Sequence, residues 1–121
     1  MANGFAWTTL HIGDLDKSLA LYRDIMGMKE IKRYRIEVVD ETIAILESAD
    51  GAKLELVQVP GYKLEFTEQE NFSLAFEVDD AMAIIEQIGS ECRMHVEIDA
   101  ETQFFFTTDP DGYPLNLIER K

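Results

Sequence analysis

The sequence predicts an α+β fold built from two βαβββ modules. The main observation is a repeat, because segment 49–57 recurs sixty-one residues later as segment 110–118, and each copy is an Asp-Gly turn followed by a strand that aligns Leu54 with Leu115. Each half also contains a stretch with apolar residues at helical spacing that ends at a glycine. Since a repeated segment indicates a repeated fold unit, we expect the modules to form a curved mixed sheet around a cavity, with the helices on its outer face.

The first module is expected over residues 5–59. Asp14 has a side chain suited to capping a helix, and the apolar residues that follow it are spaced for one buried helical face. Alternating and β-branched residues then predict strands, and the Asp50-Gly51 turn introduces the last of them. The expected elements are a strand at 5–12, a helix from Asp14 to Gly27, and strands at 31–39, 42–46 and 53–59.

A second module is expected over residues 72–119, after a linker at 60–71. The linker is rich in polar residues and carries a Pro-Gly breaker, and the whole chain of 121 residues suits a single domain. The expected elements are a strand at 72–78, a helix that begins at Asp79 or Asp80 and ends at Gly89, strands near 93–98 and 103–107, and a last strand after the second Asp-Gly turn.

The polar residues of these strands mark a candidate ligand pocket. The variable position between the two repeated leucines is Glu55 in the first copy and Asn116 in the second, and both lie on faces that mix polar and apolar side chains. Such a mixture is typical of a concave binding site rather than a solvated surface. The predicted pocket residues are Trp7, Thr9, His11, Glu55, Ser73, Glu77 and Asn116.

The composition excludes some partners. The chain has 24 acidic and 11 basic residues and a net charge of −13, whereas nucleic acids and anionic membranes require a basic surface. The single cysteine, Cys92, cannot form an internal disulfide, and no basic, apolar signal peptide opens the chain. We therefore expect no nucleic acid partner, no membrane partner and a cytoplasmic location.

The order of motifs resembles the vicinal oxygen chelate superfamily, which includes glyoxalase I, the bleomycin-resistance proteins and the extradiol dioxygenases. Segment 10–15 leads into the first predicted helix, and segment 26–28 follows its end. Segment 109–119 is the stretch most typical of the superfamily. The resemblance implies paired βαβββ modules and a homodimer. It does not settle the reaction, because the superfamily includes isomerases, dioxygenases, transferases and drug-binding proteins.

By this resemblance, the four positions that hold the divalent metal in glyoxalase I correspond here to Trp7, Glu55, Ser73 and Asn116. Glu55 is a strong ligand, but an indole binds no cation, and serine and asparagine are weak neutral donors. The arginine that holds a glutathione carboxylate in glutathione-dependent members is replaced by His11, which lacks the bidentate guanidinium. We therefore expect no metal ligand set and no cofactor.

Several alternatives remain open for single residues. Glu55 serves as an acid-base group or pairs with Lys53 or an arginine, and Trp7 is a stacking platform or a plug that fills the pocket. His11 and Glu77 meet as a pair or lie at a solvent-exposed rim.

Two functions follow from these observations. The first is a metal-independent protein that binds a small, aromatic or cationic molecule in the cavity. The alternative is a glyoxalase-type lyase or isomerase, similar to lactoylglutathione lyase, with a non-standard nickel, zinc, manganese or cobalt site centred on Glu55, which is then the catalytic residue.

Overall fold

The structure is a computed structural model that describes residues 2–63 and 72–120. It divides into two compact units, Met1–Lys63 and Leu64–Lys121. The linker predicted at 60–71 lies largely outside the described residues.

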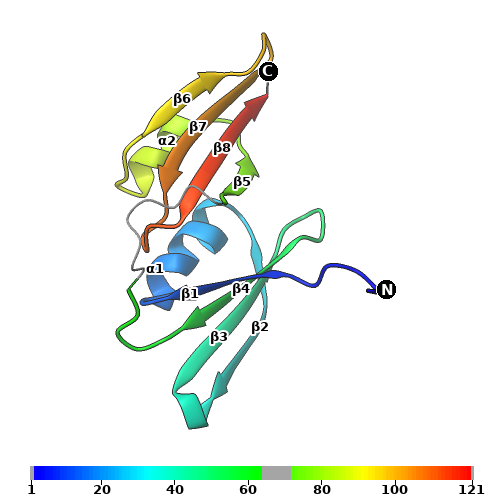
Figure 1. The fold of residues 1–121 in the computed structure, drawn as a ribbon, viewed down its shortest axis with the longest axis vertical. Coiled ribbons are helices and arrows are strands. Elements are labelled where there is room, and N and C mark those ends of the chain that lie inside the picture. The colour runs from blue at the N-terminus through cyan, green and yellow to red at the C-terminus, as the bar shows by residue number, and fades with distance from the viewer. Residues whose placement is uncertain (1, 64–71, 121) are drawn as a thin grey trace. The chain divides into compact units, whose positions relative to one another are not determined.

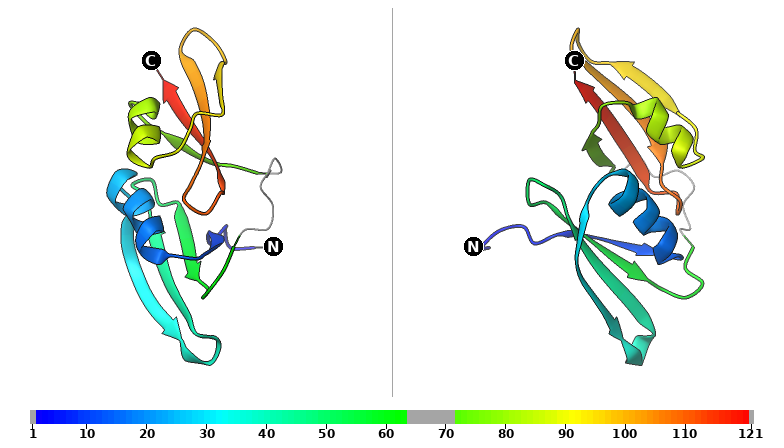
Figure 2. Two further views of the ribbon diagram at one scale, coloured as in Figure 1. Left: turned by 90° about the vertical axis from the view of Figure 1, so that its left-hand side faces the viewer. Right: turned by 180° about the vertical axis from the view of Figure 1, so that it is seen from behind.

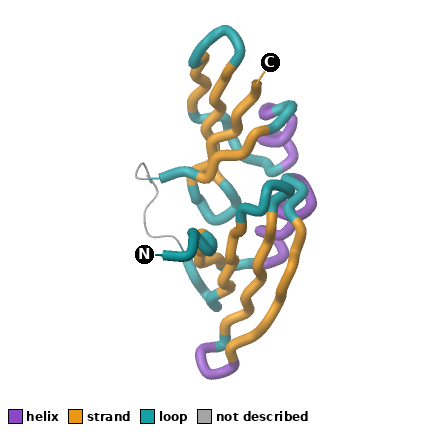
Figure 3. The backbone as a smooth tube through the Cα atoms, turned by 90° about the vertical axis from the view of Figure 1, so that its right-hand side faces the viewer, coloured by secondary structure: helices purple, strands orange, loops and turns teal. Residues whose placement is uncertain are grey.

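The first unit is a four-stranded mixed sheet covered by one helix (Figures 1 and 2). Its strand order is β1-β4-β3-β2, in which β1 and β4 are parallel and the other pairs are antiparallel. A short 3₁₀ turn, Glu37–Val39, closes the β2–β3 hairpin and appears as the purple tip of that hairpin in Figure 3. The elements are β1 (Thr8–Ile12), α1 (Leu15–Leu19), a π-helical segment (Ala20–Ile25), β2 (Lys29–Ile36), β3 (Glu41–Glu47) and β4 (Lys53–Gln58).

The second unit repeats this topology, with a much shorter strand β6 in the place of β2. Its strand order is β5-β8-β7-β6, and its parallel pair, β5 with β8, corresponds to the pair β1 with β4. The elements are β5 (Leu74–Glu77), α2 (Ala81–Gln87), β6 (Met94–Glu97), β7 (Thr102–Thr108) and β8 (Pro114–Arg120). The predicted α+β class and the order strand, helix, strand, strand, strand in each half are thus confirmed.

The helix caps form as the sequence predicts. The Asp14 side chain accepts a hydrogen bond from the Lys17 amide, and the Asp80 side chain accepts one from the Ala83 amide. Each aspartate satisfies an amide that the first helical turn leaves without an intrahelical acceptor. The first helix differs from the prediction after Leu19, where it widens into the π-helical segment that ends before Gly27.

Each helix packs on one face of its own sheet. In the first unit, Leu10 of β1 and Leu56 of β4 are cross-strand partners and are buried. Leu15 and Leu19 of α1 are also buried and belong to the same core. In the second unit Leu115 and Leu117 of β8 are fully buried. The two repeated leucines therefore form the core in both modules, as the repeat implies.

The opposite face of the first sheet carries a second apolar strip. Ile43, Ile45 and Val57 form a buried cluster with Val59 packed against it. Because side chains alternate along a strand, Ile45 faces the same side as its cross-strand partner Glu55. The predicted mixture of polar and apolar side chains is present on this face.

Among the described residues, no helix combines the length and the apolar character that crossing a membrane requires.

Candidate functional site

Glu55 lies at the centre of the first sheet and accepts hydrogen bonds at both carboxylate oxygens. It pairs with Thr9 in β1 and with Ile45 in β3. The Thr9 hydroxyl donates to Oε1 at 2.9 Å, and the Tyr34 hydroxyl lies 3.5 Å from Oε2. Two hydroxyl donors therefore orient a half-buried carboxylate on the face of the sheet that the helix does not cover.

Tyr34 is a site residue that the sequence analysis did not find. Its strand, β2, is exposed along most of its length and looks like a solvated edge in the sequence. Partial burial, and then the Glu55 carboxylate, raise the pKa of the Tyr34 hydroxyl above its usual value, so this group remains a donor at neutral pH. The Lys32 ammonium lies 5.4 Å from the centre of the Tyr34 ring.

The ion pair considered for Glu55 has a different acceptor. Lys53 Nζ lies 3.3 Å from Glu47 Oε2, across the antiparallel pair of β3 and β4. In the described part of the chain the hydrogen bonds of Glu55 come from neutral hydroxyls, which leave its negative charge available to a cation or a proton.

Trp7 and His11 lie at the two ends of the same edge of this sheet. Trp7 precedes β1 and is 40% exposed. This exposure fits a stacking surface better than a plug that fills the pocket. His11 is exposed, and its ring meets the Tyr62 ring edge-on with centroids 5.9 Å apart.

Asn116 occupies the position in the second unit that Glu55 occupies in the first. It pairs with Ala75 in β5 and with Phe106 in β7, as Glu55 pairs with Thr9 and Ile45. Its side chain is only 7% exposed, and Oδ1 has no hydrogen-bond partner among the described residues. A buried carbonyl oxygen without a donor costs free energy, which a ligand donor or cation would recover.

The other two predicted residues of this unit are exposed. Ser73 precedes β5, and Glu77 at the end of β5 accepts a hydrogen bond from Arg120 Nε at 2.8 Å. The pair between Glu77 and Arg120 is an exposed surface contact, and such contacts add little to stability.

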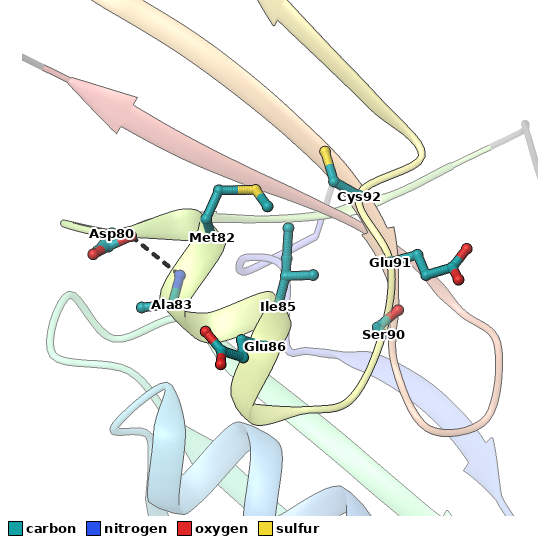
Figure 4. A pocket seen from close by; sticks show the side chains of 8 residues that line it. All are labelled: Asp80, Met82, Ala83, Ile85, Glu86, Ser90, Glu91 and Cys92. Carbon is teal, nitrogen blue, oxygen red and sulfur yellow. Dashed lines mark hydrogen bonds between the residues drawn. The ribbon is translucent and has the colours of Figure 1, made fainter.

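The second unit also has a groove of about 590 Å³ between α2 and the segment that follows it (Figure 4). Met82 and Ile85 line its helix side, and Cys92 lines the other side, with its thiol 3.5 Å from the Met94 carbonyl oxygen. None of its described lining residues belongs to the predicted pocket, and nothing in the groove assigns Cys92 a reaction.

The donor set favours oxygen-preferring cations. Within residues 2–63 and 72–120, no three histidine, cysteine, aspartate or glutamate side chains lie together as a metal-binding group. The strong donor at the family positions is the Glu55 carboxylate of the first unit. Carboxylate and carbonyl oxygens suit Mn²⁺, whereas tight zinc and nickel sites use imidazole or thiolate ligands.

Comparison with known proteins decides the family. The model of the Glyoxalase/Bleomycin resistance protein/Dioxygenase superfamily matches residues 4–117. The chain belongs to this superfamily. The suspected resemblance to the vicinal oxygen chelate proteins is confirmed.

Two similar curated proteins are named as a probable lactoylglutathione lyase and a lactoylglutathione lyase. The chain is 33% identical to the probable lactoylglutathione lyase of Vibrio parahaemolyticus, over 100% of this chain and 94% of the relative. It is 31% identical to the lactoylglutathione lyase of Haemophilus influenzae, over 94% of this chain and 90% of the relative. The similarity therefore extends over both modules.

Solved structures share the fold. A glyoxalase family protein from Bacillus cereus superimposes with a TM-score of 0.82 at 17% identity, over 99% of this chain and 95% of the other. The fosfomycin resistance protein FosX from Listeria monocytogenes, crystallised with Mn(II) and a sulfate ion, gives a TM-score of 0.74 at 20% identity, over 100% and 95%.

The prediction that the protein uses no cofactor is wrong. The prediction rested on three weak ligand positions and gave less weight to the rest of the chain. The chain is similar along its length to lactoylglutathione lyases, and it shares its fold with a protein crystallised with Mn(II). Divalent metal chemistry is compatible with this fold, and the physical reason for excluding it was incomplete, because oxygen donors alone can hold a hard cation.

Proposed function

We propose that this protein is a glyoxalase-type lyase or isomerase that acts on a small molecule with adjacent oxygen atoms and uses a divalent cation at a non-standard site centred on Glu55. The observation that carries the proposal is the geometry of Glu55, whose two carboxylate oxygens accept from the Thr9 and Tyr34 hydroxyls. The names of the curated relatives support lactoylglutathione as the type of product to test.

The position of Glu55 suits the chemistry of moving a proton between neighbouring carbon atoms. A base for this reaction must be ionised, oriented and accessible. Thr9 fixes one oxygen of the carboxylate at normal hydrogen-bond length, and the side chain is half-buried above an apolar strip.

Glu55 would hold the cation, which when bound would supply Lewis-acid polarisation of the substrate oxygens. Glu55 would also take the proton from the carbon atom beside them. An ionised carboxylate offers about four lone-pair sites over two oxygens, so one oxygen can serve the cation while the other accepts a proton.

The other predicted pocket residues of the first unit would contact the substrate. Trp7 offers an exposed aromatic surface. Thr9 is assigned to the positioning of Glu55. His11 is exposed and would contact polar substituents.

The activity test uses chelator-stripped protein and the hemithioacetal of glutathione and methylglyoxal. We expect formation of lactoylglutathione after addition of Mn²⁺, and a loss of at least about 100-fold in kcat/KM in the Glu55→Gln variant, which keeps the shape of the side chain but removes its charge and basicity. Lys53→Gln, on the same strand and face but paired with Glu47, is the matched control.

An absence of turnover of this substrate with Mn²⁺, nickel, zinc and cobalt, each tested separately, would contradict the proposal. A fluorescence change of Trp7 with aromatic or cationic compounds in the same preparation would then assign the protein to ligand binding.

We also propose a homodimer in the cytoplasm. Apolar side chains of the β2 strand and the turn after it are exposed, which favours burial against a second copy. The exposed residues are Ile31, Ile36, Val38 and Val39. Light scattering should give twice the mass of the 13.8 kDa chain, and Val38→Lys should shift this mass toward that of a single chain.

A further inference from the structure

Tyr34 reaches the site from a strand that is not adjacent to β4. It lies in the edge strand β2, where it pairs with Ile43, and β3 separates β2 from β4. Its hydroxyl nevertheless lies 3.5 Å from Glu55 Oε2. The phenol ring therefore spans β3 on the face that carries Ile43 and Ile45, and this crossing puts a second polar group beside the carboxylate.

The two oxygens of Glu55 are held unequally. The Thr9 hydroxyl donates to Oε1 at 2.9 Å, within the normal range, whereas the Tyr34 contact to Oε2 is at the long limit for a hydrogen bond. A donor in so long a contact loses little when it turns to another acceptor. Oε2 and the Tyr34 hydroxyl are thus the pair of atoms that a substrate can engage.

Two charged groups act on Tyr34 in opposite directions: in addition to partial burial, the Glu55 carboxylate raises the pKa of the hydroxyl until Glu55 takes up the substrate proton, whereas Lys32 stabilises a developing negative charge. The Lys32 ammonium lies 5.4 Å from the centre of the phenol ring, and a cation over an aromatic ring is attracted more strongly as the ring gains electron density. The strip below the ring, formed by Ile43, Ile45 and Val57, is 4–7% exposed. Tyr34 itself is exposed, so its hydroxyl is open to a substrate.

We propose that Tyr34 is a catalytic residue that donates its hydroxyl proton to a substrate oxygen while Glu55 removes a proton from the adjacent carbon. The proposal rests on the isomerase function proposed above. It assigns an acid and a base to two side chains of the same sheet.

The proton movements balance without any oxidant or reductant. In the first half, the C–H bond of the substrate breaks as its proton passes to Glu55, and the Tyr34 O–H bond breaks as the neighbouring carbonyl becomes a hydroxyl, which leaves an enediol. In the second half, the other hydroxyl returns a proton to the Tyr34 oxygen, and Glu55 returns its proton to the second carbon. The net result is an isomerised substrate and an unchanged enzyme.

The test compares wild type, Tyr34→Phe and Lys32→Met in the hemithioacetal assay, with Mn²⁺ titrated into each protein by calorimetry. We expect Tyr34→Phe to lower kcat by about 10²–10⁴-fold, the contribution typical of a general acid, with KM and Mn²⁺ affinity changed by less than about threefold. Lys32→Met should lower kcat by about threefold to tenfold, since it removes a charge that acts through the ring. Arg35→Gln, on the same strand with its side chain paired to Asp40, is the matched control and should match wild type.

The outcomes separate the two proposals. An active wild type with an equally active Tyr34→Phe variant overturns the role of Tyr34 and leaves the isomerase function standing. A Tyr34→Phe variant that loses Mn²⁺ affinity in proportion to activity also overturns it, because Tyr34 would then only shape the site. A wild type without turnover overturns both.

Discussion

The contacts of single residues explain why the sheet of the first unit can support proton transfer or cation binding. In the first unit, one carboxylate sits among hydroxyl donors and aliphatic side chains, and its neighbouring lysine pairs with Glu47. Within residues 2–63 and 72–120, no ion pair neutralises the charge of Glu55. This arrangement suits a group that must bind a cation or move a proton.

Thr9 is expected to act through Glu55. Thr9→Val removes the hydroxyl that fixes Oε1 and keeps the shape of the side chain. Residues that orient a metal ligand typically contribute about 10–100-fold to affinity, so we expect Mn²⁺ to bind about tenfold or more weakly, as measured by calorimetry. Thr8→Val, at the preceding position of β1 and therefore on the other face of the strand, is the control. Equal affinities of Thr9→Val and wild type would show that the hydroxyl does not orient the carboxylate.

Sequence reasoning reached some site residues and missed another for a geometric reason. Glu55 and Asn116 stand out because they replace each other in a repeat, which is a property of the sequence. Tyr34 belongs to the site because its long side chain crosses β3, and the sequence does not reveal which strand lies between β2 and β4. The sequence of an alternating strand with exposed charges is the same whether or not one of its aromatic side chains reaches the site residue Glu55.

The secondary-structure elements also divide into features that the sequence predicts and features that depend on packing. The caps at Asp14 and Asp80, the glycine stops and the buried leucines of the repeat follow from local rules. The π-helical continuation of α1 does not, because a wider turn depends on how Leu21 and Tyr22, both buried, pack in the completed core.

The cap at the first helix makes a measurable contribution. Asp14→Ala removes the acceptor for the Lys17 amide, and the loss of a cap residue typically costs about 1 kcal/mol of unfolding free energy. Asp14→Asn keeps an acceptor oxygen and should stay close to wild type. Urea denaturation of the three proteins checks this, and an alanine variant as stable as the asparagine variant would contradict the cap.

A charged cluster ties the end of the π-helical segment to β2 and makes stability depend on pH. Glu30 accepts from Arg33 and Arg23, and the Arg33 guanidinium, followed by Arg23, holds the pKa of the Glu30 carboxyl below its usual value. A lowered pKa in the folded state means that the stabilisation is present above the unfolded-state pKa, which is near 4.5, and is lost as pH falls through the lower folded-state pKa.

The difference in unfolding free energy between wild type and Glu30→Gln should therefore be no more than about 1 kcal/mol at pH 6, because both arginines are substantially exposed. This difference should shrink as pH falls below 4.5. Urea titrations at pH 6, 4 and 3 measure it. A difference that grows on acidification would have the wrong sign for a carboxylate stabilised by arginine.

At the scale of the whole molecule, two copies of one topology carry different polar residues at equivalent positions. The repeat made the fold predictable, since each copy has the same caps, turn and buried leucines. The cofactor was not predictable by the same route, because ligand strength was judged residue by residue against the family pattern. Similarity along the chain to lactoylglutathione lyases corrects that judgement.

The most direct measurement is calorimetric titration of chelator-stripped protein with Mn²⁺ at neutral pH, with nickel, zinc and cobalt in parallel and Glu55→Gln as the paired variant. We expect saturable binding of one Mn²⁺ per chain in the wild type and its loss in the variant, since the carboxylate is the strong donor of the site. Binding that is absent, or equal in both proteins, would contradict a metal site centred on Glu55.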